Sequence, residues 1–154
     1  MNQFMQAAIE EARHAVDTAQ GGPFGAVVVR AGRIVGRGHN TVVDSNDPTA
    51  HAEVNAIRDA SRALGRFDLS DCELYTSCEP CPMCYAAAYW ARIPRIYRGA
   101  TKDDAARIGF DDRAMYEDLA RPADERKIPL IELDREACLK PFMYWESKPD
   151  KVPY

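Results

Sequence analysis

The sequence lacks the features that would point to a polyanion or a membrane as its partner. It has no run of Lys or Arg that could follow a chain of phosphates, and its formal net charge is −4. No apolar stretch approaches the roughly 20 residues that a membrane-spanning helix needs. Residues 1–5 show no basic region followed by an apolar one, so no secretory signal is visible. We therefore expect a cytoplasmic protein that binds neither nucleic acid nor membrane.

The chain also lacks the biased composition of a disordered protein. Of its 154 residues, 46% are hydrophobic and 29% are charged, and there are no repeats. This length allows a single domain, residues 1–154, to bury a core without disulfide staples. In a reducing compartment, its five cysteines favour a metal site, catalysis or core packing over disulfides.

The apolar pattern predicts strands that alternate with helices. Helical spacing and capping residues predict helices over residues 5–16, 48–64 and 80–91, and a mixed helical segment over 101–119. Short β-branched or apolar runs predict five strands, at residues 25–29, 34–38, 72–76, 95–99 and 128–133. This alternation indicates an α/β layered fold.

Two short segments carry the residues of a metal site. Cys81 and Cys84 are three residues apart, so on a helix they face the same way. The amides and dipole of a helix N-terminus favour thiolates there. His51 lies near the start of the helix predicted over residues 48–64 and supplies a third ligand. A catalytic zinc ion has three protein ligands and leaves the fourth position to water, which matches this set.

Glu53 is two residues from His51, where its carboxylate can reach the water without binding the metal. Coordination to zinc lowers the pKa of water toward neutrality. A neighbouring carboxylate can take the released proton and deliver it to a substrate nitrogen. The pattern therefore predicts metal-assisted hydrolysis with Glu53 as the proton shuttle.

Cys78 leaves a second interpretation open. It lies three residues before Cys81, so three thiols and His51 could enclose a structural zinc ion. A run of three cysteines is also found around iron–sulfur clusters. Two features favour catalysis: Pro80 should keep Cys78 in an extended segment aimed away from the other thiols, and Glu53 has no role in a closed site.

The two segments together resemble the signature of the zinc nucleobase deaminases, H-x-E followed by P-C-x-x-C. Here it reads His51-Ala52-Glu53 and Pro80-Cys81-Pro82-Met83-Cys84. The whole chain resembles the cytidine deaminase-like fold, which implies a three-layer α/β/α sandwich with a mixed five-stranded sheet. The resemblance implies one Zn²⁺ per subunit.

Other segments resemble the bacterial guanine deaminases of this fold. They are residues 22–26 (GPFGA), 45–53, 75–84, 89–92 and 109–112 (GFDD), and the terminal Tyr154. The resemblance implies hydrolysis of guanine to xanthine and ammonia, a step of purine catabolism. Guanosine, cytosine or another small amino-bearing ring is the alternative substrate. A tRNA adenosine deaminase is disfavoured by the acidic balance, and a structural zinc module stays open.

The resemblance also implies the residues that contact the base: Phe24, Asn40, Ala52, Trp90, Asp112 and Tyr154. Asp112 would have a catalytic part, because guanine offers N1–H and its amine as donors and a carboxylate accepts both. The resemblance further implies a homodimer, in which the C-terminal segment, about residues 135–154, can be swapped. Tyr154 would then close its own or the partner's pocket.

Each of these residues has an ordinary alternative use. Asn40 can hold a turn after a strand, and Asp112 can cap a helix. Phe24 and Trp90 can pack in the core. The role of Glu79, which precedes the proline of the cysteine motif, is left open.

Overall fold

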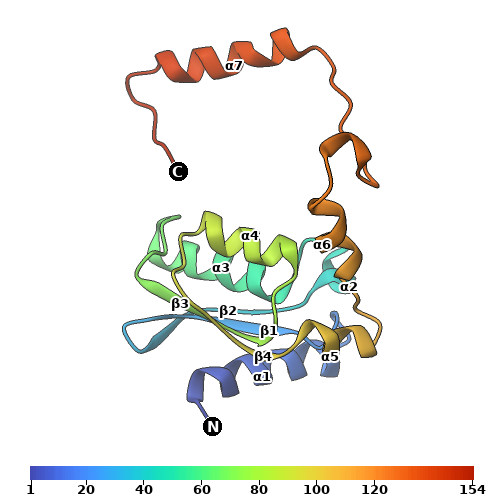
Figure 1. Cartoon of the computed structure of the whole chain (residues 1–154). Helices are drawn as coiled ribbons and strands as arrows, with labels where there is room; N and C mark the ends of the chain where they lie inside the picture. The colour runs from blue at the N-terminus through green and yellow to red at the C-terminus, as the bar shows by residue number, and fades with distance from the viewer. The chain divides into compact units, whose positions relative to one another are not determined.

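The computed structural model describes residues 1–154, which divide into two units, Met1–Asp112 and Arg113–Tyr154. The first unit is built on a sheet that is flanked by helices (Figure 1). Its elements are α1 (Gln3–Asp17), β1 (Gly25–Arg30), β2 (Arg33–His39), α2 (Val42–Ser45), α3 (Ala52–Leu64), β3 (Cys72–Cys78), α4 (Pro82–Trp90), β4 (Ile96–Ala100) and α5 (Lys102–Arg107). The second contains α6 (Arg113–Leu119), a short 3₁₀ helix (Ala123–Glu125) and α7 (Arg135–Ser147).

The sheet is mixed and has the order β2-β1-β3-β4. β1 pairs antiparallel with β2 and with β3, whereas β3 and β4 run parallel. β1 lies inside the sheet and is buried along nearly all of its length, which explains its continuous apolar sequence. β3 also lies inside, and it leads directly into the cysteine motif.

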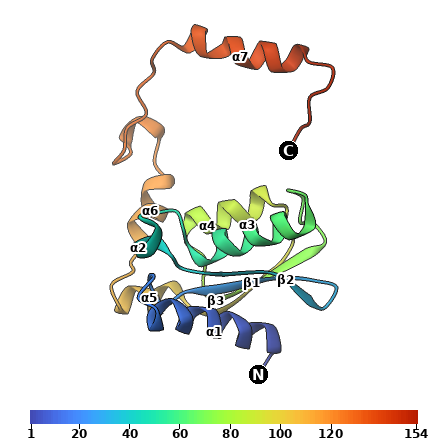
Figure 2. The same ribbon diagram turned by 180° about the vertical axis from the view of Figure 1, so that it is seen from behind.

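Helices cover both faces of this sheet, as Figures 1 and 2 show for α1 on one face and α3 with α4 on the other. Successive side chains of a strand point to opposite faces. Val27 and Val29 of β1 therefore join the core on the α1 side, while Ala26 and Val28 join the core beneath α3 and α4. The α/β class predicted from the sequence is confirmed.

The first turn of α3 lies very close to β2. A side chain at Gly38 would collide with backbone atoms of Ala52 and Ala56, and one at Gly36 would meet the backbone of Ala56 and Ala60. Only glycine in the strand and alanine on the helix allow this approach. The packing fixes the start of α3 against the sheet, and the start of α3 carries the first half of the predicted metal site.

The predicted start of this helix near residue 48 is wrong. The Asp47 side chain accepts hydrogen bonds from the backbone N–H (2.8 Å) and hydroxyl (2.7 Å) of Thr49, which holds a turn instead of capping a helix. The helix begins at Ala52, with His51 as its N-cap residue.

The fifth strand predicted at residues 128–133 is also wrong, because the sheet has four strands. A strand needs a neighbour to pair its N–H and C=O groups, and this segment forms no ladder with any strand of the chain. Its apolar side chains are exposed, Ile131 at 84%. α7 was not anticipated, since Pro141 interrupts its sequence. No helix is both long and apolar enough to span a membrane.

Candidate active site

The beginnings of α3 and α4 bring three metal-binding side chains together. His51 is the N-cap residue of α3, Cys81 is the N-cap residue of α4, and Cys84 lies in the first turn of α4. The Nδ1 atom of His51 is 3.6 Å from Sγ of Cys81 and 3.5 Å from Sγ of Cys84. All three donor atoms lie within 4.8 Å of one another.

This donor set fits zinc. Tetrahedral zinc ligands at about 2.0–2.3 Å from the ion lie roughly 3.5 to 4 Å apart, and the distances from His51 to the two thiols fall in this range. The hydrogen bond from Cys84 holds the pKa of Cys81 well below its usual value, and His51 lowers it further. A thiolate is the form of cysteine that binds a metal ion.

Glu53 lies in the first turn of α3, beside the cluster but outside its donor set. The side chain is buried, at 6% exposure. Its Oε1 atom is 3.3 Å from the hydroxyl of Thr76, which donates to it from β3. Burial raises the pKa of Glu53 above its ordinary value. A carboxyl group of this kind can act as acid and as base.

Cys78 is directed away from the cluster, as its place before Pro80 predicted. Its thiol lies 3.5 Å from the backbone carbonyl of Thr101 and donates to it. Burial raises the pKa of Cys78, which keeps it protonated. The protein therefore offers three donors at this point and not the closed four-ligand set.

Asn40 follows β2 and is buried. Its side-chain oxygen accepts the backbone N–H of Gly22 at 3.3 Å and that of Val42 at 3.1 Å. Asn40 therefore does stabilise the turn after β2. The same two hydrogen bonds fix the orientation of its side-chain amide, whose nitrogen forms no hydrogen bond within the protein.

Phe24 lies on the loop before β1, and Phe110 and Asp112 lie on the segment after α5. The ring of Phe24 meets the ring of Phe110 edge to face, with centroids 4.9 Å apart. Asp112 is partly buried, and this burial raises the pKa of its carboxyl group. The negative charge of Cys81 raises this pKa further. The ring contact joins the 109–112 segment to the loop before β1.

Three other residues were predicted to contact the base: Ala52, Trp90 and Tyr154. Ala52 is fully buried as the first residue of α3. Trp90 is the last residue of α4, so about 13 Å of helix separates it from Cys81, and it is 69% exposed. Tyr154 belongs to the second unit and is exposed.

Several supporting residues were not found from the sequence. Asn55 of α3 donates to the carbonyls of His39 (2.9 Å) and Ala50 (3.3 Å) and lies 3.0 Å from the Thr41 hydroxyl. It therefore fixes the loop that carries Asn40. No role was predicted for Thr76 or Phe110, although both lie in segments that carry the resemblance, residues 75–84 and 109–112.

Glu79 contacts β4 and the start of α5. Its carboxylate accepts the backbone N–H of Lys102 at 3.3 Å and lies 3.6 Å from Arg98. These contacts tie the segment before the cysteine motif to the start of α5. Glu79 therefore has a structural use in the protein.

Comparison with known proteins agrees with this geometry. Residues 1–100 match the family described as the cytidine and deoxycytidylate deaminase zinc-binding region. Guanine deaminase from Bacillus subtilis (strain 168) is 48% identical over 151 residues, which cover 98% of this chain and 97% of that protein. The X-ray structure of guanine deaminase from Bacillus subtilis matches with a TM-score of 0.95, covering 100% of this chain and 99% of that chain.

Two further proteins extend the comparison. A guanine deaminase from Nitrosomonas europaea matches with a TM-score of 0.68 at 37% identity, over 71% of this chain and 64% of that chain. A tRNA-specific adenosine deaminase from Agrobacterium fabrum (strain C58) is 47% identical over 139 residues, covering 90% of this chain and 91% of that protein. The similarity thus extends to deaminases of free bases and of tRNA.

Proposed function

Because the chain belongs to the cytidine and deoxycytidylate deaminase family of zinc-binding proteins, we propose that it hydrolyses guanine to xanthine and ammonia. The observation that carries this proposal is the convergence of three zinc donors with a buried carboxyl group at their side. A structural zinc site has no use for such a carboxyl group. The similarity to guanine deaminases over nearly the whole chain supports guanine as the substrate.

We assign the zinc ion, one per subunit, to His51, Cys81 and Cys84. Their atoms have the identity and spacing that zinc requires. Bound zinc supplies the activation of a water molecule, whose pKa it lowers toward neutrality. The two helix starts hold the three side chains in place, so that the site is largely formed before the metal binds.

Glu53 moves the protons of the reaction. Its carboxylate takes a proton from the attacking water and passes it to a ring nitrogen of guanine. The second proton goes to the amino group at C2, which leaves as ammonia when the C–N bond breaks. The oxygen of the water stays on C2 as the carbonyl oxygen of xanthine, so guanine and water give xanthine and ammonia. The raised pKa of Glu53 suits both proton transfers.

Asn40 and Asp112 recognise the base in this proposal. The Asn40 oxygen is occupied by two backbone N–H groups, so its amide nitrogen is the donor that is left for a purine acceptor. The Asp112 carboxylate accepts from the N–H groups of guanine. Phe24 forms an apolar wall that Phe110 braces. Ala52, at the start of α3, offers a backbone N–H that the helix itself leaves unpaired.

In this proposal, Trp90 and Tyr154 complete the pocket, although they lie on other elements than Phe24, Asn40 and Asp112. We propose that Tyr154 closes the pocket of its own or of the partner subunit, with Trp90 as a further wall. Both residues are aromatic and exposed in the single chain. Planar bases favour such apolar walls.

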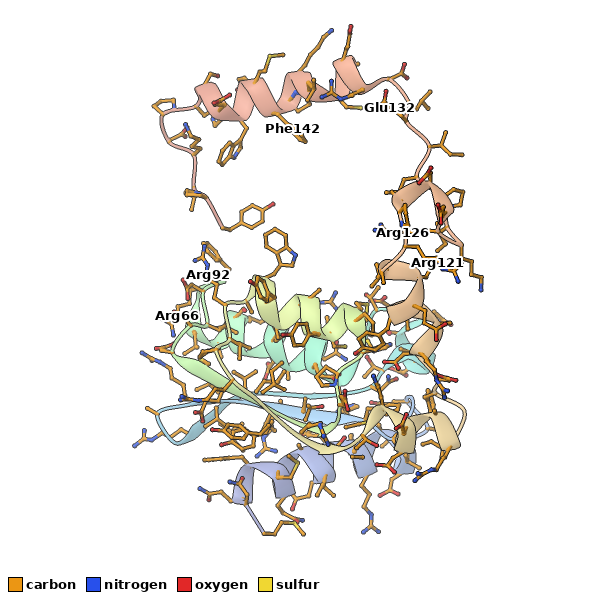
Figure 3. The ribbon with its side chains drawn as sticks, viewed as in Figure 1. Arg66, Arg92, Arg121, Arg126, Glu132 and Phe142 are labelled. Carbon is orange, nitrogen blue, oxygen red and sulfur yellow. The ribbon has the colours of Figure 1, made fainter.

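We propose a homodimer in which the C-terminal segment, about residues 135–154, is exchanged between subunits. Apolar side chains of the second unit are exposed in the single chain, Phe142 of α7 at 70% (Figure 3). The edge strand β4 is exposed as well, and a groove lined by Tyr85, Tyr89 and Ile96 lies beside it. Exposed apolar surface of this kind marks an interface, and a second copy offers the matching surface.

In this proposal the two units act together as one zinc deaminase domain, residues 1–154. We place the enzyme in purine catabolism, in the cytoplasm, where its five free thiols would stay reduced. Its substrate is then a small nucleobase, and it needs neither nucleic acid nor a membrane.

A direct assay tests the substrate. The zinc-loaded protein is offered guanine, guanosine, cytosine, adenine and cytidine in parallel, and ammonia release is followed. Guanine should be deaminated with the highest kcat/KM. Rapid release from cytosine, with none from guanine, would overturn the proposal.

The similarity to a tRNA-specific adenosine deaminase calls for one more arm of this assay. A tRNA with adenosine at the wobble position is offered at low and at moderate salt. We expect no inosine, because a net charge of −4 opposes binding to a polyanion. Salt-sensitive inosine formation that exceeds guanine turnover would replace the proposed function with RNA editing.

A further inference from the structure

We propose that Thr76 is the positioning residue of the proton shuttle and that its hydroxyl holds the carboxyl group of Glu53 against the reacting atoms. This inference rests on the proposed deamination. It assigns a task to a residue that lies on β3, outside both motifs of the site. Three observations carry it: the place of Thr76 in the sheet, its burial and its hydrogen-bond partners.

Thr76 occupies an apolar row of the sheet. On β3 it shares one face with Cys72 and Leu74, and it pairs with Ala26 on the neighbouring strand. All of these side chains belong to, or line, the core beneath α3 and α4. Valine has the same shape and would fill this position without a polar atom. The presence of a hydroxyl therefore needs an explanation other than packing.

The hydroxyl of Thr76 is buried away from water, since the residue is 1% exposed. A buried hydroxyl costs free energy unless it is hydrogen-bonded. Its partners are Oε1 of Glu53 at 3.3 Å and the backbone carbonyl of Cys78 at 3.0 Å. The carbonyl belongs to the last residue of the same strand. The carboxyl group of Glu53 belongs to a different element and is the group that the reaction uses.

The two partners hold the Thr76 hydroxyl between the backbone of β3 and the carboxyl group of Glu53. A hydroxyl has one hydrogen to donate and can also accept from another group. Thr76 can therefore stay in contact with the carboxyl group as donor or as acceptor, with the carbonyl of Cys78 as its second partner. The carboxyl group of Glu53 is thus kept in place and does not turn away from the substrate.

Thr76 is also well placed because its position does not depend on the metal. Glu53 has no other hydrogen-bond partner among the side chains of the sheet. β3 is an inner strand, paired with β1 and β4 over the residues around Thr76. A group held on such a strand moves little. The carboxyl group is consequently fixed from the sheet side, while the zinc ligands come from the helix starts.

The test compares two substitutions that change opposite parts of the side chain. Thr76→Val removes the hydroxyl and keeps the shape, whereas Thr76→Ser keeps the hydroxyl and removes the methyl group. We expect Thr76→Val to lower kcat by about tenfold to a hundredfold, the effect of losing a hydrogen bond to a charged group. KM and zinc content should stay unchanged. Thr76→Ser should keep kcat within about threefold of the wild type.

A purely structural role of Thr76 predicts different results. Thr76→Val would then keep the full kcat of the wild type, or both variants would lose zinc and thermal stability together. Either result would overturn the inference. A second pair guards against misfolding of the valine variant. Thr76→Ala and Thr76→Ser both lack the methyl group and differ only in the hydroxyl. An equal kcat in these two variants would therefore also overturn the Thr76 inference.

The assays use the ring that the wild-type protein deaminates fastest in the substrate panel. A wild type that ignores guanine but deaminates another ring would overturn the substrate assignment alone. The comparison of the Thr76 variants would still hold, because the shuttle is common to both reactions. Wild-type turnover of guanine together with an unimpaired valine variant would overturn the Thr76 inference alone.

Discussion

At the level of single residues, we propose that the recognition of guanine depends on the carboxylate of Asp112. Asp112→Asn keeps the size of the side chain but replaces one acceptor with a donor, which meets the N–H groups of guanine unfavourably. We expect kcat/KM for guanine to fall by about a hundredfold or more. The zinc content should not change, because Asp112 is outside the donor set.

The neighbouring Asp111 offers a matched control, since Asp111→Asn makes the same chemical change one residue away. We expect this variant to keep most of its guanine turnover. Steady-state kinetics and metal analysis on both proteins check the prediction. Full turnover in Asp112→Asn would show that the carboxylate takes no part in recognition.

The residues of the zinc site could be predicted from the sequence because zinc restricts both the type and the spacing of its ligands. His51, Cys81 and Cys84 are brought together as expected, and Pro80 does separate Cys78 from them. Thr76 and Asn55 could not be predicted, since their roles arise from tertiary neighbours. Nothing in a local run of residues records such a contact.

At the scale of elements, the position of the site depends on the close packing of α3 against β2. Gly38→Ala places a methyl group against the backbone of Ala52 and Ala56, neither of which can move without shifting the helix. We expect a loss of about 2 kcal/mol or more in the free energy of unfolding. For a chain of this length, Tm should fall by roughly 5 °C or more.

Arg33→Ala is the control for this variant, because Arg33 lies on the same strand and its side chain is exposed. Its Tm should stay close to that of the wild type. Differential scanning calorimetry measures both proteins. A Gly38→Ala protein that unfolds at the wild-type temperature would mean that α3 does not need this close approach.

The order of helices and strands in the first unit was largely predictable, whereas the start of α3, the absence of a fifth strand and the presence of α7 were not. Short β-branched or apolar runs located β1 to β4, whose buried side chains pack in the cores beneath the helices. Asp47-Pro48 has the form of a helix start, but the hydrogen bonds of Asp47 to Thr49 make a turn there. The segment 128–133 has the composition of a strand, and it has no strand beside it with which to pair.

At the scale of the whole molecule, the exposed apolar surfaces predict a dimer that depends on the C-terminal segment. Sedimentation should give twice the mass of one chain for the full-length protein. A chain that ends at Asp134 lacks α7 and should lose both the dimer and the guanine turnover. Deletion of Tyr154 alone should keep the dimer and lower the turnover. A truncated monomer with full activity would exclude an essential exchanged segment.

We propose that the zinc centre is catalytic and that Glu53 carries the protons of the reaction. Glu53→Gln is the most direct test, since it keeps the size of the side chain and removes its ability to take a proton. Zinc content and ammonia release from guanine are measured on this variant and on the wild type. We predict one zinc per chain in both proteins and a loss of about 10²- to 10⁴-fold in turnover. A zinc-loaded Glu53→Gln protein that deaminates guanine at the wild-type rate would show that Glu53 does not carry these protons.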